Sequence, residues 1–140
     1  IKQKEEVVRF GELKNKILLH SLALKYAKVP FGIITKGEIV VIEFPYSNLK
    51  SVKRSPVLIL KVPKGDDVIV AQITGESYED YVEIPLKKED FKQGSLKRVS
   101  HLRIDKIASI EKYLIKYKAG SLKQDKFNEI IDKICSFFKS

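Results

Sequence analysis

Residues 37–45, which read GEIVVIEFP, decide the fold of this chain. Before them, apolar residues recur at spacings of three to seven and predict a helix. Within them, β-branched residues follow one another between a Gly and a Pro, which predicts a β-strand. We therefore expect an N-terminal helical extension over residues 1–35 and a β domain over residues 36–140.

The β pattern continues through most of the second part. Further strands are predicted over residues 56–62, 67–74, 81–84 and 95–104, with one or two more within 106–117. Pro63-Lys64-Gly65-Asp66 is a turn signal that makes the strands on its two sides a hairpin. Polar and charged residues predict loops over 46–54 and 87–94.

The last segment predicts an amphipathic helix. Its apolar residues recur on one face: Phe127, Ile130, Ile131, Ile134 and Phe138. Ser121 and Gln124 have the spacing of a capping box, and Cys135, beside the stripe, is expected to be a small buried hydrophobe. Short strands, a hairpin and a terminal helix predict a mainly β protein, a small β-barrel closed by the C-terminal helix.

Composition narrows the function classes. Lys and Arg outnumber Asp and Glu by 27 to 18, and a net charge of +9 favours a polyanionic partner, although many solvated lysines would give the same value. One cysteine and two separated histidines exclude an internal disulfide and argue against a structural metal site. The sequence lacks a run of about 18 apolar residues and a signal peptide, so we expect a cytoplasmic protein without a membrane span. Common nucleotide-binding and hydrolase motifs are missing, and no cofactor is expected.

Five short motifs follow one another along the β domain. They are KGEIVVIEFPYSNL at 36–49, KRSPVLIL at 53–60, AQIT at 71–74, SHLRIDKI at 100–107 and GSL at 120–122. In this order they resemble the MazF/PemK toxins of type II toxin–antitoxin systems, over about residues 36–139. None of the motifs is specific alone, but the ordered set is.

The resemblance implies an SH3-like barrel that forms a homodimer, cleaves single-stranded RNA without a metal and is blocked by an antitoxin. It also implies a catalytic Arg at the start of the second strand and a catalytic Thr at the end of the third, which makes Arg54 and Thr74 the candidates. The family's Arg directly precedes Pro, where this chain has Ser55. A shift of one residue turns a strand side chain to the opposite face, unless the strand start lets Arg54 reach back.

The predicted RNA-binding residues are polar, basic or aromatic: Tyr46, Lys53, Ser55, Arg98, Ser100, His101 and Arg103. Basic residues beside Tyr46 suit backbone tracking with an aromatic platform, and the two arginines suit phosphate contacts. His101 could transfer protons, because histidine titrates near neutral pH. Each of these residues could instead be an ordinary solvated residue. Thr74 could likewise have no role in catalysis, because threonine is common at strand ends.

The leading hypothesis is a toxin that cleaves single-stranded RNA sequence-selectively and pairs with a cognate antitoxin. The alternative is a non-catalytic barrel that binds RNA or a partner and has lost the catalytic Arg at Ser55. The N-terminal helix could cover the dimer interface, occupy the RNA groove as an inhibitor, or be an unrelated extension. Because this helix has a wide apolar face, the chain could also be a structural or partner-binding domain.

Overall fold

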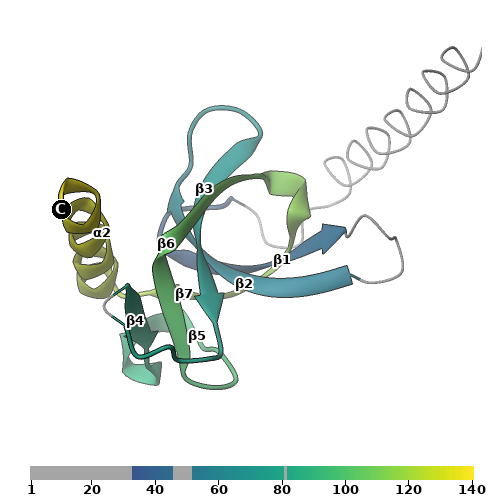
Figure 1. Ribbon diagram of the computed structural model, residues 1–140. Coiled ribbons are helices and arrows are strands. Elements are labelled where there is room, and N and C mark those ends of the chain that lie inside the picture. The colour runs from purple at the N-terminus through teal and green to yellow at the C-terminus, as the bar shows by residue number, and fades with distance from the viewer. Residues whose placement is uncertain (1–32, 46–51, 81) are drawn as a thin grey trace, which may run out of the picture. The chain divides into compact units, whose positions relative to one another are not determined.

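One antiparallel sheet and a terminal helix make up the part of the chain that the computed structural model describes, residues 33–45, 52–80 and 82–140 (Figure 1). The strands are β1 Glu38–Pro45, β2 Val52–Lys61, β3 Asp67–Thr74, β4 Glu83–Leu86, β5 Phe91–Gly94, β6 Ser100–Glu111 and β7 Ile115–Leu122. The helix is α2 Gln124–Lys139, and the short 3-10 turns are η1 Lys88–Asp90 and η2 Lys112–Leu114. The helix predicted within residues 1–35 falls almost wholly outside the described residues.

The sheet has the strand order β4-β6-β3-β2-β1-β7-β5, and its strands curl around one another into a half-barrel (Figure 1). Long β6 pairs with both β3 and β4, and β7 pairs with both β1 and β5. A register shift between Ala71 and Ile73 interrupts the pairing of β3 with β6, and such bulges increase strand bending. The predicted fold class, a mainly β small barrel with a C-terminal helix, is confirmed.

Alternation along the strands explains the core. Ile39, Leu58 and Leu102 belong to the cluster that packs against α2, which contributes Phe127 and Ile130. Burying one such side chain stabilises the fold by roughly 1.5–3 kcal/mol. Neighbouring strand residues point to the other face and are also buried: Val40, Ile42, Val57, Ile59 and Val70. The sheet is therefore apolar on both faces over most of its length.

The start of α2 differs from the prediction. Ser121 lies in β7 opposite Glu38, so it cannot cap the helix, and the N-cap residue is Lys123 without a side-chain cap. Cys135 is exposed, which makes the prediction of a buried cysteine wrong. The buried stripe of α2 is Phe127, Ile130 and Ile134, and Cys135 lies one residue, about 100° of helix rotation, past it. Phe138 is 68% exposed in the last turn.

Three other boundaries also differ, because pairing with a neighbouring strand overrides local polarity. Val52–Arg54 belongs to β2 instead of the predicted loop 46–54, and β5 lies within the predicted loop 87–94. Strand β6 begins only at Ser100 and continues to Glu111. The hairpin of β2 and β3 is confirmed, with Gly65 at a φ of 108° in its turn.

Candidate active site

Three polar residues share one face of the sheet at the end where β2 begins and β3 ends. Thr74, the last residue of β3, lies directly opposite His101 of β6. Val57 of β2 lies opposite Gln72 of β3, and Ser55 and Thr74 are each two residues further toward this end. Opposite residues, and residues two apart on a strand, point to the same face. The structure therefore brings Ser55, Thr74 and His101 together.

Arg54 points to the other face. It lies opposite Glu43 of β1, and its Nε is 3.5 Å from Glu43 Oε2. Its side chain is 64% exposed, whereas Ser55 is buried. Lys116 of β7 contacts the same carboxylate oxygen at 3.5 Å. The structure does not bring Arg54 together with Thr74.

Arg103 is fully engaged with acidic neighbours. Its Nη1 donates to both carboxylate oxygens of Asp80 at 3.0 and 2.9 Å, and its Nε and Nη2 donate to Asp105, each at 3.1 Å. The guanidinium carbon also lies 5.3 Å from the ring centre of Tyr78. Hydrogen bonds to Asp105 and then Asp80 raise the pKa of Arg103. These contacts fasten the loop before β4 to β6.

Glu83 of β4 organises the same loop. Its carboxylate accepts hydrogen bonds from the Ser77 hydroxyl at 2.6 Å and from the backbone N–H groups of Tyr78 and Glu79 at 2.9 and 3.0 Å. These donors, led by Ser77, lower the pKa of Glu83 because they stabilise the ionised form. Glu79 has a φ of 50°, so the loop turns tightly around the carboxylate. The carboxylate is held in one position beside β6.

His101 lies between this carboxylate and Thr74. The sheet order β4-β6-β3 places β6 in the middle, and His101 is opposite Pro85 on one side and Thr74 on the other. Its Nδ1 is 4.0 Å from Glu83 Oε1, is buried, and has no hydrogen-bond partner within the described part of the chain. The Thr74 hydroxyl oxygen accepts from the Glu76 N–H at 3.2 Å, which leaves its proton available to another acceptor.

The other predicted residues lie around this group. The Arg98 guanidinium covers Gly75, the residue after Thr74, so closely that a methyl group on Gly75 would lie 2.5 Å from Nη2. Ser100 is buried and donates to the Arg98 carbonyl at 3.1 Å, which fixes the backbone that carries this arginine. Lys53 is exposed near the start of β2. Tyr46 lies outside the described residues.

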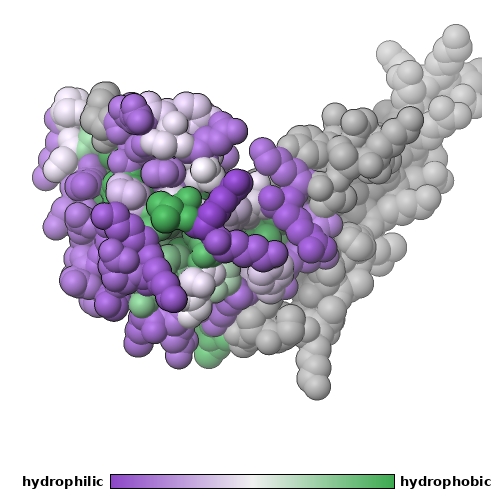
Figure 2. Space-filling model, turned by 90° about the horizontal axis from the view of Figure 1, so that it is seen from below, coloured by the Kyte–Doolittle hydropathy of each residue, from purple (hydrophilic) through white to green (hydrophobic). Residues whose placement is uncertain are grey.

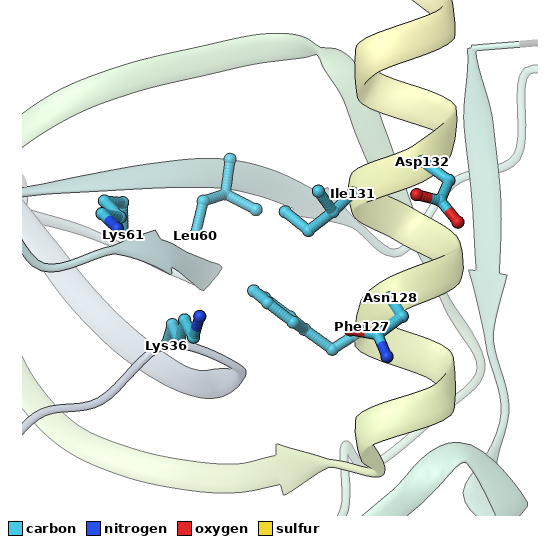
Figure 3. A pocket seen from close by; sticks show the side chains of 7 residues that line it. All are labelled: Lys36, Leu60, Lys61, Phe127, Asn128, Ile131 and Asp132. Carbon is cyan, nitrogen blue, oxygen red and sulfur yellow. The ribbon is translucent and has the colours of Figure 1, made fainter.

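Hydrophilic residues cover most of the side seen in Figure 2, around a small hydrophobic area. A groove of about 440 Å³ lies beside Arg98 and is lined by Leu86, Phe91, Leu96 and Val99, among others. A second hollow of about 510 Å³ lies between α2 and the end of β2, at the far end of that strand from Ser55 (Figure 3).

Residues 33–45, 52–80 and 82–140 contain no group of three or more His, Cys, Asp or Glu side chains placed to hold a metal ion. None of their helices is long and apolar enough to cross a membrane.

A family model described as PemK-like, MazF-like toxin of type II toxin–antitoxin system matches residues 35–138. The chain belongs to this family. The match covers the whole sheet and nearly all of α2, so the resemblance of the ordered motifs is confirmed. None of the curated proteins matches the chain.

Solved structures of MazF toxins share the fold. Mycobacterium tuberculosis toxin MazF-mt6 is 24% identical with a TM-score of 0.58, over 73% of this chain and 96% of that one. A chain of the MazE–MazF structure from Deinococcus radiodurans is 16% identical with a TM-score of 0.62, over 76% and 97%. An endoribonuclease in complex with its cognate antitoxin from a Mycobacterial species is 14% identical with a TM-score of 0.59, over 74% and 93%. At these identities the likeness shows the fold.

Glu83, Asp80 and Gly75 are parts of this region that the sequence analysis missed. Glu83 lies near His101 because β4 pairs with β6, and no local sequence pattern predicts this pairing. The spacing of Arg103 and Asp105 was a usable signal, because residues two apart on a strand share a face. It would have indicated that Arg103 has a partner on its own strand.

Proposed function

We propose that this chain is the toxin of a type II toxin–antitoxin pair and that it cleaves single-stranded RNA sequence-selectively without a metal ion. The observation that carries the proposal is the place of Thr74, at the end of β3 and opposite His101, in a chain of the MazF/PemK family. Structures of the same fold include proteins described as endoribonucleases, which supports this activity class.

The chemistry needs a polar site and no bound cofactor. The 2′-hydroxyl of the RNA attacks the adjacent phosphorus, and negative charge develops on the phosphoryl oxygens. The Thr74 hydroxyl donates a hydrogen bond to one of these oxygens, where a donor placed in advance lowers the barrier. Arg98, whose cation lies over Gly75, is the nearest described arginine without a carboxylate contact and would neutralise the same charge.

Binding of the RNA backbone rests on the positive charge of the chain. The net charge of +9 attracts phosphates at long range. In this proposal Lys53 and Arg98, whose guanidinium covers Gly75 beside Thr74, contact phosphates, and Tyr46 is an aromatic platform for a base. In this proposal Arg103 holds the loop before β4 in place, and Arg54 contacts phosphate from the opposite face.

Two protein partners are part of the proposal. The cognate antitoxin is supported by family membership and by the two antitoxin complexes among the similar structures. A homodimer in the cytoplasm is the state in which we expect the toxin to act. We also propose that residues 1–35 form an N-terminal helical extension.

RNA cleavage in the presence of EDTA tests the proposal. We expect the wild-type chain to cleave single-stranded RNA with the chelator present, and Thr74→Ala to lose about 10²-fold in rate. Ser109→Ala, an exposed hydroxyl elsewhere on β6, is the matched control and should cleave at the wild-type rate. Equal rates for Thr74→Ala and wild type, or no cleavage by either, would contradict the proposal.

The second candidate is a barrel that binds RNA without cleaving it. It is favoured by the position of Ser55, which is buried where the family has the catalytic Arg, while Arg54 pairs with Glu43 on the opposite face. Titration of labelled single-stranded RNA at two salt concentrations tests it. Binding that weakens with salt, without cleavage, supports the binder; no salt-sensitive binding would remove RNA as a ligand.

A further inference from the structure

We infer that His101 is the proton-transfer residue of this site and that Glu83 positions it, an assignment that rests on the proposed endoribonuclease function. Cleavage by the 2′-hydroxyl requires a base to remove its proton and an acid to protonate the leaving oxygen. Thr74 and Arg98 can stabilise charge but cannot serve as a base near neutral pH.

Cross-strand pairing places the imidazole at the reacting group. His101 lies directly opposite Thr74, and the Cβ atoms of such pairs are about 4.5–5.5 Å apart. A phosphate that accepts a hydrogen bond from the Thr74 hydroxyl would therefore lie within reach of the ring. Ser55, on the same face, has a small buried side chain.

The orientation of the ring follows from its two nitrogens. Nδ1 is buried, has no hydrogen-bond partner among the described residues, and faces Glu83 Oε1 at 4.0 Å. A carboxylate beside Nδ1 favours the tautomer with the proton on Nδ1, which leaves the lone pair on Nε2. The distance is longer than a hydrogen bond, and such contacts often tighten when the substrate binds. Nε2 is then the base.

The Glu83 carboxylate is suited to hold that position. Three donors of the loop before β4 fix it, so it cannot swing away from β6. Arg103, whose Nη1 is 3.9 Å from Glu83 Oε2, stands on its other side. Asp80 and Asp105 accept hydrogen bonds from Arg103, which holds this arginine beside Glu83.

One histidine can carry out both proton transfers of the reaction. Nε2 takes the proton of the 2′-hydroxyl as the 2′-oxygen forms its bond to phosphorus. The bond between phosphorus and the 5′-oxygen breaks, and the imidazolium returns the proton to that oxygen. The products are a 2′,3′-cyclic phosphate and a 5′-hydroxyl, with no net uptake of protons or electrons.

A pH–rate profile with matched variants tests the inference. We expect wild-type cleavage to fall in acid as the imidazole becomes protonated, and His101→Gln to lose about 10²–10⁴-fold at neutral pH. The charged groups around His101 are Glu83 from β4, Arg103 from β6 and, through Arg103, Asp80 from the preceding loop. Glu83→Gln removes the carboxylate that orients the imidazole, so kcat should fall while binding of RNA that cannot be cleaved stays at the wild-type level.

Controls separate this inference from the function on which it rests. Glu111→Gln, an exposed glutamate at the far end of β6, should keep the wild-type profile. Binding of RNA with a 2′-deoxy residue at the cleavage site checks that His101→Gln and Glu83→Gln are folded, and His101→Asn provides a second variant. If wild type cleaves RNA and folded His101→Gln or His101→Asn cleaves it at the same rate, the inference about His101 is overturned. The proposed endoribonuclease function is then unaffected. A wild-type kcat in Glu83→Gln overturns the role of Glu83, and no cleavage by wild type overturns both proposals.

Discussion

The two faces of the sheet, at the end where β2 begins, carry their charges in different ways. On one face Arg103 and Glu83 form hydrogen bonds with the loop before β4, Arg103 also donates to Asp105 of β6, and His101 lies beside Glu83. On the other face Arg54 and Lys116 contact Glu43 at 3.5 Å without tighter geometry. The first arrangement fixes side chains in space, whereas the second mainly neutralises charge.

This difference indicates where chemistry is possible. Exposed ion pairs are weak and mobile, so they cannot hold a group within a fraction of an ångström of a reacting phosphate. A hydrogen-bonded network in a partly buried site can. The cation that the family places before Pro56 has moved by one residue here, from the face of the network to the face of the exposed pair.

The largest expected effect comes from moving that cation back. The double substitution Arg54→Ser with Ser55→Arg restores the family order without changing composition or net charge. We expect single-stranded RNA cleavage to rise by about 10²-fold, because one well-placed donor contributes that much to stabilising a developing oxyanion. Initial cleavage rates measured at saturating RNA provide the comparison with wild type.

Arg54→Ser alone is the matched control for this swap. It removes the ion pair with Glu43. At saturating RNA it should change the cleavage rate far less than the swap does, because Arg54 lies on the face opposite to that of Ser55. A swap that is folded by thermal melting but cleaves no faster would show that the face of Ser55 is not where the cation acts.

A smaller effect, on stability, compares one arginine from each face. Arg103→Met removes hydrogen bonds to Asp80 and Asp105 and leaves their carboxylates without these donors, so we expect a loss of roughly 1–2 kcal/mol in the free energy of unfolding. Arg54→Met should cost less than about 0.5 kcal/mol, because the Arg54 side chain is largely exposed and Lys116 still contacts the same Glu43 oxygen. Urea unfolding of both variants measures the difference, and equal losses would mean that the network does not add to stability.

Much of the fold could be predicted from the sequence because β-branched runs bounded by Gly and Pro are local signals. The hairpin of β2 and β3 and the strand β1 follow from such runs. Strand β5 and the first residues of β2 do not, because they are polar and become strands through pairing with β7 and β1. Ser121 was misread for the same reason, since its sheet partner Glu38 is far away in sequence.

The sequence names candidate site residues one by one, but it does not give their arrangement in space. Alternation was enough to expect Arg54 opposite to the face of Ser55. The pairing of Thr74 with His101 required the register of β3 and β6, which a bulge between Ala71 and Ile73 shifts. No sequence rule places a bulge in advance, so the neighbours of His101 became visible only in the structure.

The smallest effect concerns pH and the carboxylate at the centre of the network. Hydrogen bonds led by Ser77 lower the pKa of Glu83 below its ordinary value of 4.5. A carboxylate with a lowered pKa in the folded state stabilises the fold at pH values above 4.5, and this contribution is lost as pH falls through the lowered value. Wild type should therefore lose stability in acid more steeply than Glu83→Gln.

The acid loss should shrink in Glu83→Gln but not vanish, because a second carboxylate also has a lowered pKa. Burial opposes ionisation of Glu38, yet hydrogen bonds from Lys118 and Thr35 outweigh burial and lower the pKa of Glu38 as well. Urea midpoints measured on both sides of pH 4.5 for wild type, Glu83→Gln and the exposed control Glu111→Gln separate the two contributions. If Glu83→Gln and Glu111→Gln lose stability in acid equally, the loop donors do not hold Glu83 in its ionised form, and the contrast between the two faces of the sheet would rest on Arg103 alone.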